Sequence, residues 1–312
     1  MKVIIQIPCY NEEKTLPLVF KTIPKKLPGV DVVETLIIDD GSTDKTVEVA
    51  KKLGVDHIIT RTHRGLARGF HDGANYALAH GADILVNTDG DNQYPQEMIG
   101  DLVKPILDGT ADIVVADRQT AKIAHFSPLK KLLQRFGSYI VNKAAGTNVP
   151  DAPSGFRAYS RHSLMRLNLI TRFSYTMETI IQAGNKGLVI ASVAVTTNPK
   201  TRESRLFKNM WQHVFKSGSA IFRAYVMYKP YVVFSTLGLI MLIGGLLPFV
   251  RYFILLAAGD FGNHLQSLML GAVLITASFL SFALGVISDL IRTNRTLQED
   301  ILERTKEIQF KR

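Results

Sequence analysis

Cysteine is nearly missing from this 312-residue chain, which contains only Cys9. A single thiol excludes any disulfide within the chain and favours a reducing compartment. The first residues, MKVIIQIPCYNEE, also have no basic stretch, long apolar core or small-residue cleavage site, so we expect a strand here and no signal peptide. Phosphate-binding glycine loops of the G-x-G-x-x-G and G-x-x-x-x-G-K-[ST] types are absent too. The sequence therefore excludes a nucleotide site built on either of these glycine-rich loops.

Acidic residues are outnumbered, because 27 Asp and Glu stand against 37 Lys and Arg, for a formal net charge of +10. Such a charge indicates an anionic partner, which can be nucleic acid, anionic lipid or a phosphorylated substrate. Nucleic acid is disfavoured because the chain has no helix-turn-helix, zinc-ligand cluster or aromatic-basic RNA motif. The histidines His63, His71, His125 and His213 show no metal-ligand spacing, which disfavours a metal site built on histidines.

Strand-like and helical patterns alternate up to about Pro199. Short runs rich in β-branched residues occupy positions 2–8, 33–40, 56–60, 82–89 and 111–117, and several of them end in carboxylates. Apolar residues at helical spacing, with capping residues and terminal glycines, mark 42–54, 65–81 and 95–109. This alternation predicts an α/β fold with a mostly parallel sheet and helices on both faces. Ligands bind such sheets beyond the carboxyl ends of the strands, where the acidic residues lie.

Charge is missing from two long stretches after Pro199. Residues 231–250 and 268–288 are uncharged over about the 20 residues that a bilayer-spanning helix needs. Buried core helices are the alternative, and they are disfavoured because soluble helices seldom stay uncharged for so long. Residues 230–291 are therefore predicted to contain two transmembrane helices. The basic amphipathic segment 200–229 is expected along the inner leaflet, and 292–312 is predicted to be a cytoplasmic amphipathic tail helix.

The orientation of these spans follows from the placement of Lys and Arg. Basic residues are frequent before the first span and in the tail, whereas the connection AAGDFGNHLQS has none. Arg251 is the exception, and we expect it to snorkel at the outer boundary. Both ends of the chain and the domain 1–199 are therefore predicted on the cytoplasmic side of the cell membrane.

Two carboxylates follow the strand-like run 82–89 at alternate positions, as Asp89-Gly90-Asp91, with Gln93 close behind. A solvated turn is one interpretation, because Asp-Gly is a common turn pair. A calcium loop of the EF-hand type is a second, but its sixth position requires glycine and here holds Tyr94. The third is a divalent-cation site for a nucleoside-diphosphate sugar, because the ion cancels the repulsion between the carboxylates and its other positions take pyrophosphate oxygens.

The other strand ends favour the third interpretation. The first expected strand is followed by Pro8, Tyr10, Asn11 and Glu12, and the second ends in Asp39 and Asp40. An aromatic ring with acidic and amide groups suits the base and ribose of a nucleotide, which leaves the pyrophosphate to the metal. The motifs PxYNEE, DDGSTD and DGDxQ in this order make a specific combination.

In these motifs the chain resembles an inverting family 2 glycosyltransferase of the GT-A fold. It is most similar to the polyprenyl-phosphate glycosyltransferases, of the dolichyl-phosphate mannose synthase and bacterial undecaprenyl-phosphate glucosyltransferase type. The resemblance covers nearly the whole chain, including SGFRAYSR at 154–161, RESRLFK at 202–208 and the paired apolar C-terminal runs. It implies a GT-A catalytic domain over 1–199 followed by the interfacial segment and the transmembrane hairpin.

The resemblance also implies roles for particular residues. Asp40 or Asp39 is expected on the base and Asp89 on the ribose and metal, while the usual Ser-Lys pair appears here as Ser204-Arg205. The nucleotide-sugar residues implied are Pro8, Tyr10, Asn11, Glu12, Asp39, Asp40, Asp89, Gly90, Arg202 and Arg205. The implied metal ligands for Mg2+ or Mn2+ are Asp89, Asp91 and Gln93. The acceptor phosphate is assigned to Arg118, Ser154 and Arg157, and the catalytic set is Asp91, Arg118, Arg157 and Glu178.

The chemistry of the acceptor gives an independent argument. Attack by an alcohol on an anomeric carbon calls for a carboxylate base. A phosphate monoester needs less help, because it carries about −1.5 to −2 charge at neutral pH. The enzyme must then align two anions and stabilise the departing nucleoside diphosphate with metal and arginine. Glu178 is left with three interpretations, as a general base, an orienting group near the acceptor phosphate, or a helix brace.

Other classes fit less well. A membrane enzyme that extends a saccharide hydroxyl in polysaccharide synthesis remains the alternative, but such enzymes usually carry Q-x-x-R-W, and the single tryptophan, Trp211, lies in NMWQHV. A scaffold with a degenerate domain predicts loss of a metal-side carboxylate, and a pyrophosphorylase predicts a glycine-rich basic N-terminal loop. Neither feature is found.

The sequence and the resemblance together predict transfer of a hexose from a nucleotide sugar to a polyprenyl phosphate, either undecaprenyl or dolichyl phosphate. A UDP-sugar is favoured over a GDP-sugar by the resemblance, and the identity of the sugar stays open. The expected partners are the nucleotide sugar, the lipid phosphate, the membrane and further copies of the chain in a homo-oligomer. Nucleic acid is not expected.

Overall fold

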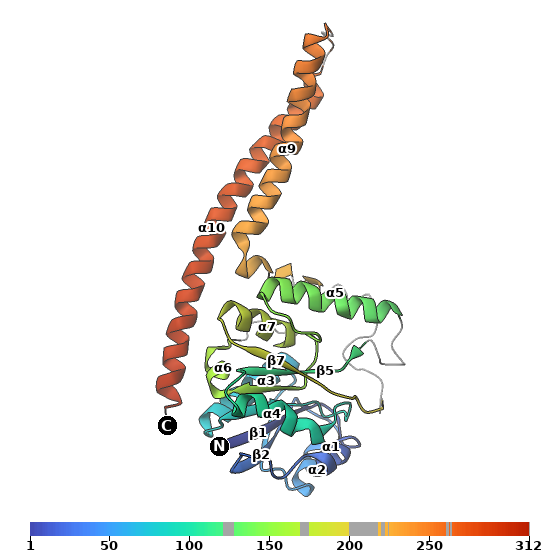
Figure 1. The fold of residues 1–312 in the computed structure, drawn as a ribbon, viewed down its shortest axis with the longest axis vertical. Helices are drawn as coiled ribbons and strands as arrows, with labels where there is room; N and C mark the ends of the chain where they lie inside the picture. The colour runs from blue at the N-terminus through green and yellow to red at the C-terminus, as the bar shows by residue number, and fades with distance from the viewer. Residues whose placement is uncertain are drawn as a thin grey trace. The chain divides into compact units, whose positions relative to one another are not determined.

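The computed structural model describes residues 1–120, 128–168, 175–199, 218–219, 222–223, 225–259, 262 and 264–311. These residues form two compact units (Figure 1). The first unit consists of Met1–Ala224 together with Leu302–Arg312, and the second is Tyr225–Ile301. Most of the predicted basic segment 200–229, including Arg202, Arg205 and Trp211, lies outside the described residues.

The first unit contains a seven-stranded sheet in the order β3-β2-β1-β4-β6-β5-β7. Strand β6 runs antiparallel to both β4 and β5, and the other pairs are parallel, which confirms the predicted mostly parallel sheet. The five expected strands are all present, and β6 and β7 were not predicted. The strands are β1 (Lys2–Cys9), β2 (Val32–Asp39), β3 (His57–Thr60), β4 (Ile84–Asn87), β5 (Ile113–Asp117), β6 (Arg157–Ser160) and β7 (Ile190–Ala194).

Helices cover both faces of this sheet, because central strands such as β1 and β4 are buried on both sides. On one face, side chains of β1 such as Val3, Ile5 and Ile7 pack in one core with α1, α2 and α4. On the other face β1 and β2 contact α3, and Gln6 of β1 lies directly against Gly73 of α3. The helical segments are α1 (Leu16–Thr22), α2 (Thr46–Lys52), α3 (Leu66–Ala79), η1 (Gln96–Met98), α4 (Ile99–Leu107), α5 (Pro128–Ala145), α6 (Arg161–Arg166) and α7 (Tyr175–Asn185).

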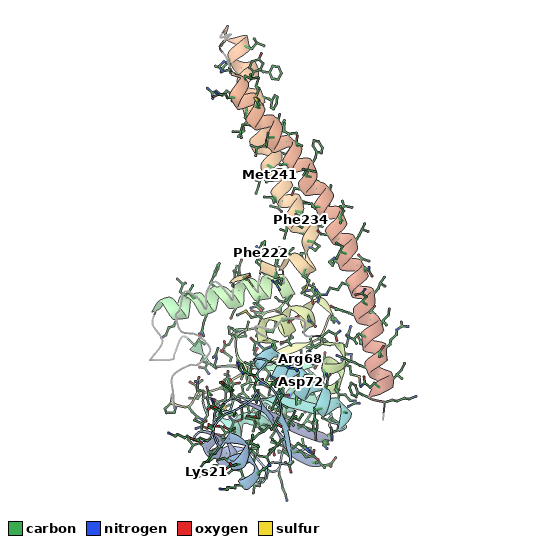
Figure 2. All side chains as sticks on the ribbon, turned by 180° about the vertical axis from the view of Figure 1, so that it is seen from behind. Lys21, Arg68, Asp72, Phe222, Phe234 and Met241 are labelled. Atoms are coloured by element: carbon green, nitrogen blue, oxygen red, sulfur yellow. The ribbon has the colours of Figure 1, made fainter. Side chains whose placement is uncertain are left out.

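Two long helices follow, α9 (Pro230–Ala257) and α10 (Leu265–Gln309), and both are long and apolar enough to cross a membrane. Phe234 and Met241 lie on α9 in the second unit (Figure 2). A Cβ on Gly245 would lie 2.9 Å from the carbonyl oxygen of Gly271, so the two backbones approach as closely as glycine permits. The hydroxyl of Ser278 donates to the Gly238 carbonyl at 2.8 Å.

The tail is helical and continues the preceding helix. We expected a tail helix over 292–312, and α10 runs without interruption from Leu265 to Gln309. The physical reason is in the sequence, because neither proline nor glycine follows Gly285 and nothing ends the helix. The last residues of α10, from Leu302, belong to the first unit.

Candidate active site

The loops that follow β1 and β2 are locked together. The two strands are in register up to Cys9 and Asp39, so both chains leave the sheet at the same edge. Asn11 adopts a φ of 57°, and its Oδ1 accepts a hydrogen bond from the Thr43 N–H at 2.7 Å. The N–H of Asn11 donates to Ser42 Oγ at 2.9 Å. Asn11 therefore shapes the loops that carry the other candidate groups.

Asp40 organises the loop that precedes α3. Its carboxylate contacts the Arg61 guanidinium at 2.6 Å and His63 Nδ1 at 2.9 Å. It also accepts from the backbone N–H groups of Arg64 at 3.0 Å and Gly65 at 2.9 Å. Both oxygens of Asp40 are therefore engaged by protein groups.

Arg61 extends this arrangement onto α3. Its NH1 group donates to Asp72 Oδ2 at 2.8 Å, and Arg68 lies 3.4 Å from the same carboxylate, one turn earlier on the helix (Figure 2). The first turns of α3 and the β3–α3 loop are thereby held as one unit.

Asp39 and Tyr10 remain as the candidate contacts for a base. Asp39 is the last residue of β2 and accepts from the Ser42 N–H at 3.2 Å. Tyr10 is 38% exposed and its ring centroid lies 4.6 Å from that of His63. Of the two alternatives for the base, we favour Asp39, because Asp40 is used to shape the loop.

The Asp89-Gly90-Asp91 turn packs on the end of β1. A Cβ on Gly90 would lie 3.2 Å from Cys9 Sγ, 3.3 Å from Glu12 Cγ and 3.3 Å from the Pro8 carbonyl oxygen. A larger residue here would have to push its neighbours back by a few tenths of an ångström, so glycine suits this close approach. The first-strand motif and the acidic turn, which are about 80 residues apart in the sequence, therefore meet at the sheet edge.

Gln93 holds Asp91. Its side-chain Nε2 donates to Asp91 Oδ2 at 2.9 Å, and its backbone N–H donates to Asp91 Oδ1 at 3.2 Å. The expected role of Gln93 was to supply an oxygen to the metal. The observed contact is that of a group that orients a carboxylate.

A third segment, Asp151–Arg157, closes on Asp89. A Cβ on Gly155 would lie 3.4 Å from both carboxylate oxygens of Asp89. The Gly155 N–H donates to Tyr94 Oη at 3.0 Å, and the Gly155 carbonyl accepts from Asn87 Nδ2 at 2.9 Å. Tyr175 is the first residue of α7, and its Oη accepts a hydrogen bond from Asn87 Nδ2 at 2.7 Å. Asn87, Tyr94 and Tyr175 were not singled out from the sequence, where their only signal is proximity to the motifs.

Arg118 lies just beyond β5 and forms a bidentate pair with Asp151. Its Nε and NH2 groups donate to the two carboxylate oxygens at 2.6 and 2.9 Å, and its side chain is 15% exposed. Burial by itself lowers the pKa of the Arg118 guanidinium, but Tyr94, Asp151 and Asp89 outweigh it and raise the pKa above its ordinary value. Nearby, the fully buried Ser154 hydroxyl has no hydrogen-bond partner within the described residues.

Arg157 does not occupy the place that was expected for it. The side chain is fully buried, and its guanidinium donates to four protein oxygens. The acceptors are Ser154 O at 2.7 Å, Thr176 O at 2.8 Å, Thr179 Oγ1 at 2.8 Å and Ala152 O at 2.6 Å. An arginine with these contacts clamps the 152–154 loop onto α7 and does not present its donors to an acceptor phosphate. The sequence could not show this, because the motif SGFR does not specify whether the arginine side chain is buried or faces the site.

Negative charge converges on three buried groups at this edge, Cys9, Tyr94 and Tyr175. Burial, followed by Glu12, Asp39, Asp44 and Asp89, raises the pKa of the Cys9 thiol well above its usual value. Burial raises the pKa of Tyr94 to about 12, with Asp89 and Asp151 adding to the effect against the opposing charge of Arg118. Burial and then Asp89 raise the pKa of Tyr175 in the same sense. Such a field attracts a cation.

The donor set fits a hard divalent ion that also binds substrate. Among the described residues, no group of three or more His, Cys, Asp or Glu side chains is arranged to hold a metal by itself. The turn carries the carboxylate oxygens of Asp89 and Asp91, which are donors of the kind that such an ion takes. Mg2+ is bound in this way, through one or two carboxylates plus substrate phosphates and not by an all-protein cage.

Glu178 lies on α7, one turn after Tyr175, and is 4% exposed. Its Oε1 accepts a hydrogen bond from Gln182 Nε2 at 3.2 Å. Arg202 and Arg205, which were expected to close over the nucleotide, lie outside the described residues.

The chain is similar to known proteins over this unit. Residues 4–167 match the family described as "Glycosyl transferase family 2". The undecaprenyl-phosphate mannosyltransferase of Micrococcus luteus is 28% identical over 207 residues, which cover 63% of this chain and 83% of that protein. The UDP-N-acetylglucosamine–dolichyl-phosphate N-acetylglucosaminyltransferase of Methanococcus voltae is 29% identical over 213 residues, 61% of this chain and 83% of that protein.

A solved structure supports the fold. Glucosyl-3-phosphoglycerate synthase from Mycobacterium tuberculosis, in complex with Mn2+, UDP-glucose and phosphoglyceric acid, matches with a TM-score of 0.56 at 20% identity, over 72% of this chain and 78% of that chain. Together with the family match, this likeness confirms the expected GT-A architecture for the first unit.

Proposed function

The chain belongs to glycosyltransferase family 2, and from this premise we propose that it transfers a hexose from a nucleoside-diphosphate sugar to a polyprenyl phosphate. The observation that carries the proposal is the meeting of three segments at one sheet edge. The Asp89-Gly90-Asp91 turn is held between the first-strand loop and the loop around Gly155. The relatives named above supply the acceptor class, because their names specify undecaprenyl and dolichyl phosphate.

The nucleotide is assigned to the β1 and β2 side of this edge. Tyr10 offers an exposed aromatic face for stacking, and Asp39 offers a carboxylate that accepts from the N–H of a base. Asn11 and Glu12 act by holding the loops, since the Glu12 N–H donates to Thr46 Oγ1 at 2.7 Å. We propose UDP as the nucleotide, in line with the UDP-sugar named for the Methanococcus relative.

The divalent cation, Mg2+ or Mn2+, is assigned to Asp89 and Asp91, with Gln93 orienting Asp91 through its 2.9 Å hydrogen bond. When bound, the ion neutralises the pyrophosphate and stabilises it as the leaving group. The carboxylates keep this edge negative without the ion, so nucleotide binding is expected to depend on it.

The acceptor phosphate is assigned to Arg118 and Ser154. Asp151 takes the Nε and one NH2 hydrogen of Arg118, so it fixes the plane of the guanidinium and leaves the remaining donors for a phosphate. The lipid phosphate is already anionic and attacks without a strong base. Glu178 is therefore assigned to orientation of the acceptor and not to proton removal.

We place the enzyme at a membrane, with the catalytic unit and both termini cytoplasmic, and as a homo-oligomer. The two helices of suitable length and composition support the membrane location. Helix α5 supports it further, because Leu132, Phe136 and Tyr139 are 64%, 57% and 61% exposed at helical spacing. An amphipathic helix of this kind suits the headgroup region beside a lipid substrate.

The test is a panel of labelled nucleotide sugars incubated with membranes that contain the protein, scored for label extracted into organic solvent. We expect one donor to give a lipid product whose formation stops with chelator and returns with Mg2+ or Mn2+. The matched control is Asp91→Asn, which keeps the size of the side chain and removes its charge. Absence of any lipid-linked label from the wild type, across UDP- and GDP-sugars, would overturn the proposal.

A further inference from the structure

A chain of buried polar groups within the first unit leads from the end of α10 to Glu178. Its members are Lys306, Asn168, Gln182 and Glu178, which are 8%, 7%, 0% and 4% exposed. Consecutive members are joined by hydrogen bonds. Buried polar groups carry a cost unless each is satisfied, so such a chain specifies one arrangement of its members.

Lys306 makes the first link. Its ammonium donates to the Leu167 carbonyl at 2.8 Å and to Asn168 Oδ1 at 2.9 Å. These oxygens follow directly on the last turn of α6, where a positive charge is stabilised by the helix dipole. Glu303, one turn earlier on α10, lies 3.2 Å from Arg166 Nε and strengthens the same attachment.

Asn168 and Gln182 make the second link. The Asn168 N–H donates to Gln182 Oε1 at 2.8 Å, and the Asn168 carbonyl accepts from Gln182 Nε2. This pair of bonds fixes which way the Gln182 amide points, because only one orientation satisfies both backbone groups. The second hydrogen of Gln182 Nε2 is thereby directed at Glu178.

Glu178 is the last link, and it reaches the proposed active site through its own helix. It lies between Tyr175, whose hydroxyl donates to the Gly155 carbonyl at 3.2 Å, and Thr179, which accepts from the buried Arg157 at 2.8 Å. The buried face of α7 therefore carries both Glu178 and the hydrogen bonds that hold the Gly155–Arg157 segment. The Gln182 N–H donates to Glu178 Oε1 at 3.2 Å and so sets the direction of this carboxylate.

We propose that Lys306 is a positioning residue for the transfer reaction, acting through Asn168 and Gln182 to hold Glu178 in the orientation that receives the acceptor. The inference rests on the proposed function. It makes the end of α10, a helix whose earlier residues are a candidate membrane span, part of the architecture of the acceptor site. Helix α10 then contributes to the chemistry as well as to any membrane attachment.

Burial of the Lys306 ammonium group carries an electrostatic cost. Burial, followed by repulsion from Lys186, lowers its pKa to about 8, against a smaller raising effect of Glu303. A lysine at an exposed position of the same helix would carry no such penalty. The hydrogen bonds to the Leu167 carbonyl and to Asn168 Oδ1, together with the charge of Glu303, offset this cost.

The test compares Lys306→Met with Arg304→Met, the matched control, because Arg304 is an exposed cation two residues earlier on the same helix. We expect Lys306→Met to lower kcat/KM for the lipid acceptor about 3- to 10-fold, as for loss of one buried hydrogen bond. The Kd for the nucleotide sugar with Mg2+ should not change. Arg304→Met should match the wild type in both measurements.

A double-mutant cycle separates positioning from simple stabilisation. Lys306→Met combined with Gln182→Met should be no worse than Gln182→Met alone, because both break one chain. Multiplied losses, or a lower Tm with unchanged kcat/KM, would overturn the inference. If Lys306→Met does not fold, Asn168→Leu replaces it in the cycle, since it removes the acceptor for Lys306 and keeps both backbone bonds to Gln182.

Failure of the inference and failure of the proposed function give different results. A wild type that transfers sugar to lipid phosphate, with Lys306→Met and Arg304→Met indistinguishable, overturns only the role of Lys306. A wild type without any transfer to lipid phosphate overturns both.

Discussion

The two ends of the same sheet treat their carboxylates in opposite ways. At the amino end, Glu34 lies 2.7 Å from both Lys2 Nζ and His57 Nε2. Burial alone would raise the pKa of Glu34, but hydrogen bonds from Lys2 and His57 outweigh it and lower the pKa. At the carboxyl end, several carboxylates surround Cys9, and together with burial they raise the pKa of its thiol.

The difference separates a stabilising cluster from a binding site. Glu34 is paired with Lys2 and His57 of its own chain, and the cluster needs no ligand. Glu12, Asp39, Asp44 and Asp89 act instead in the same sense on one buried thiol, which marks an excess of negative charge. A ligand that brings a cation relieves that excess, as a nucleoside diphosphate with its metal does.

The largest effect should come from the acidic turn. Asp91→Ala removes a proposed metal ligand, and we expect transfer to fall by about three orders of magnitude or more, because electrostatic stabilisation of the leaving group is lost. Labelled lipid product measures it. The control is Asp31→Ala at the amino end, which has a side chain 83% exposed and should retain full activity. An equal loss of transfer activity in both variants would contradict the contrast between the two ends of the sheet.

Arg118→Lys should have the next largest effect. Lysine keeps the charge but cannot form the bidentate pair with Asp151 and still present donors to a phosphate, so we expect about a 100-fold fall in kcat/KM for the lipid acceptor. The Kd for nucleotide sugar, measured with Mg2+ present, should change little. A change confined to the Kd for the nucleotide sugar would instead assign Arg118 to the nucleotide-sugar site.

Glu178→Gln should have a smaller effect. The amide keeps the shape of the side chain, and an acceptor that is already anionic needs no general base, so turnover should fall about tenfold and remain measurable. Rates with the lipid acceptor across pH 6–8 test this. Complete loss, equal to that of Asp91→Ala, would show that a base is obligatory.

The smallest effect should be at the amino end. Glu34→Gln should leave transfer unchanged and lower the free energy of unfolding by about 0.5–1 kcal/mol, because the ion pair is partly exposed. The pKa of Glu34 is lowered in the folded chain, so its contribution is complete above the unfolded carboxyl pKa and is lost as the pH falls through the folded pKa. Tm values of wild type and variant should therefore differ near pH 7 and converge below about pH 4.

The sequence predicted the parts of the fold that depend on local pattern. The five strands, the three named helices and the two apolar runs follow from periodicity and length, which act on neighbouring residues. The position of Asp89 and Asp91 at a carboxyl end followed from the alternation of strands and helices. Strand β6 was missed because RAYS is short, and because its pairing with β4 and β5 is a long-range choice.

Side-chain direction could not be predicted in this way. Asp39 and Asp40 are adjacent in the sequence, and only the loop before α3 shows which of them is engaged by Arg61. Arg157 matches a motif, yet the fold turns it inward onto carbonyl oxygens. Gln93 donates to Asp91 where an oxygen ligand was expected.

By itself the sequence determined an acidic sheet edge, a glycine between two carboxylates and two long uncharged runs, because spacing and composition act locally. Only the tertiary structure decided which charged groups meet: it buried Arg157, engaged Asp40, and joined Lys306 to Glu178 through Asn168 and Gln182. The physical reason is that burial and hydrogen bonding depend on neighbours brought from distant parts of the chain, and the same side chain binds a ligand or braces the fold according to them.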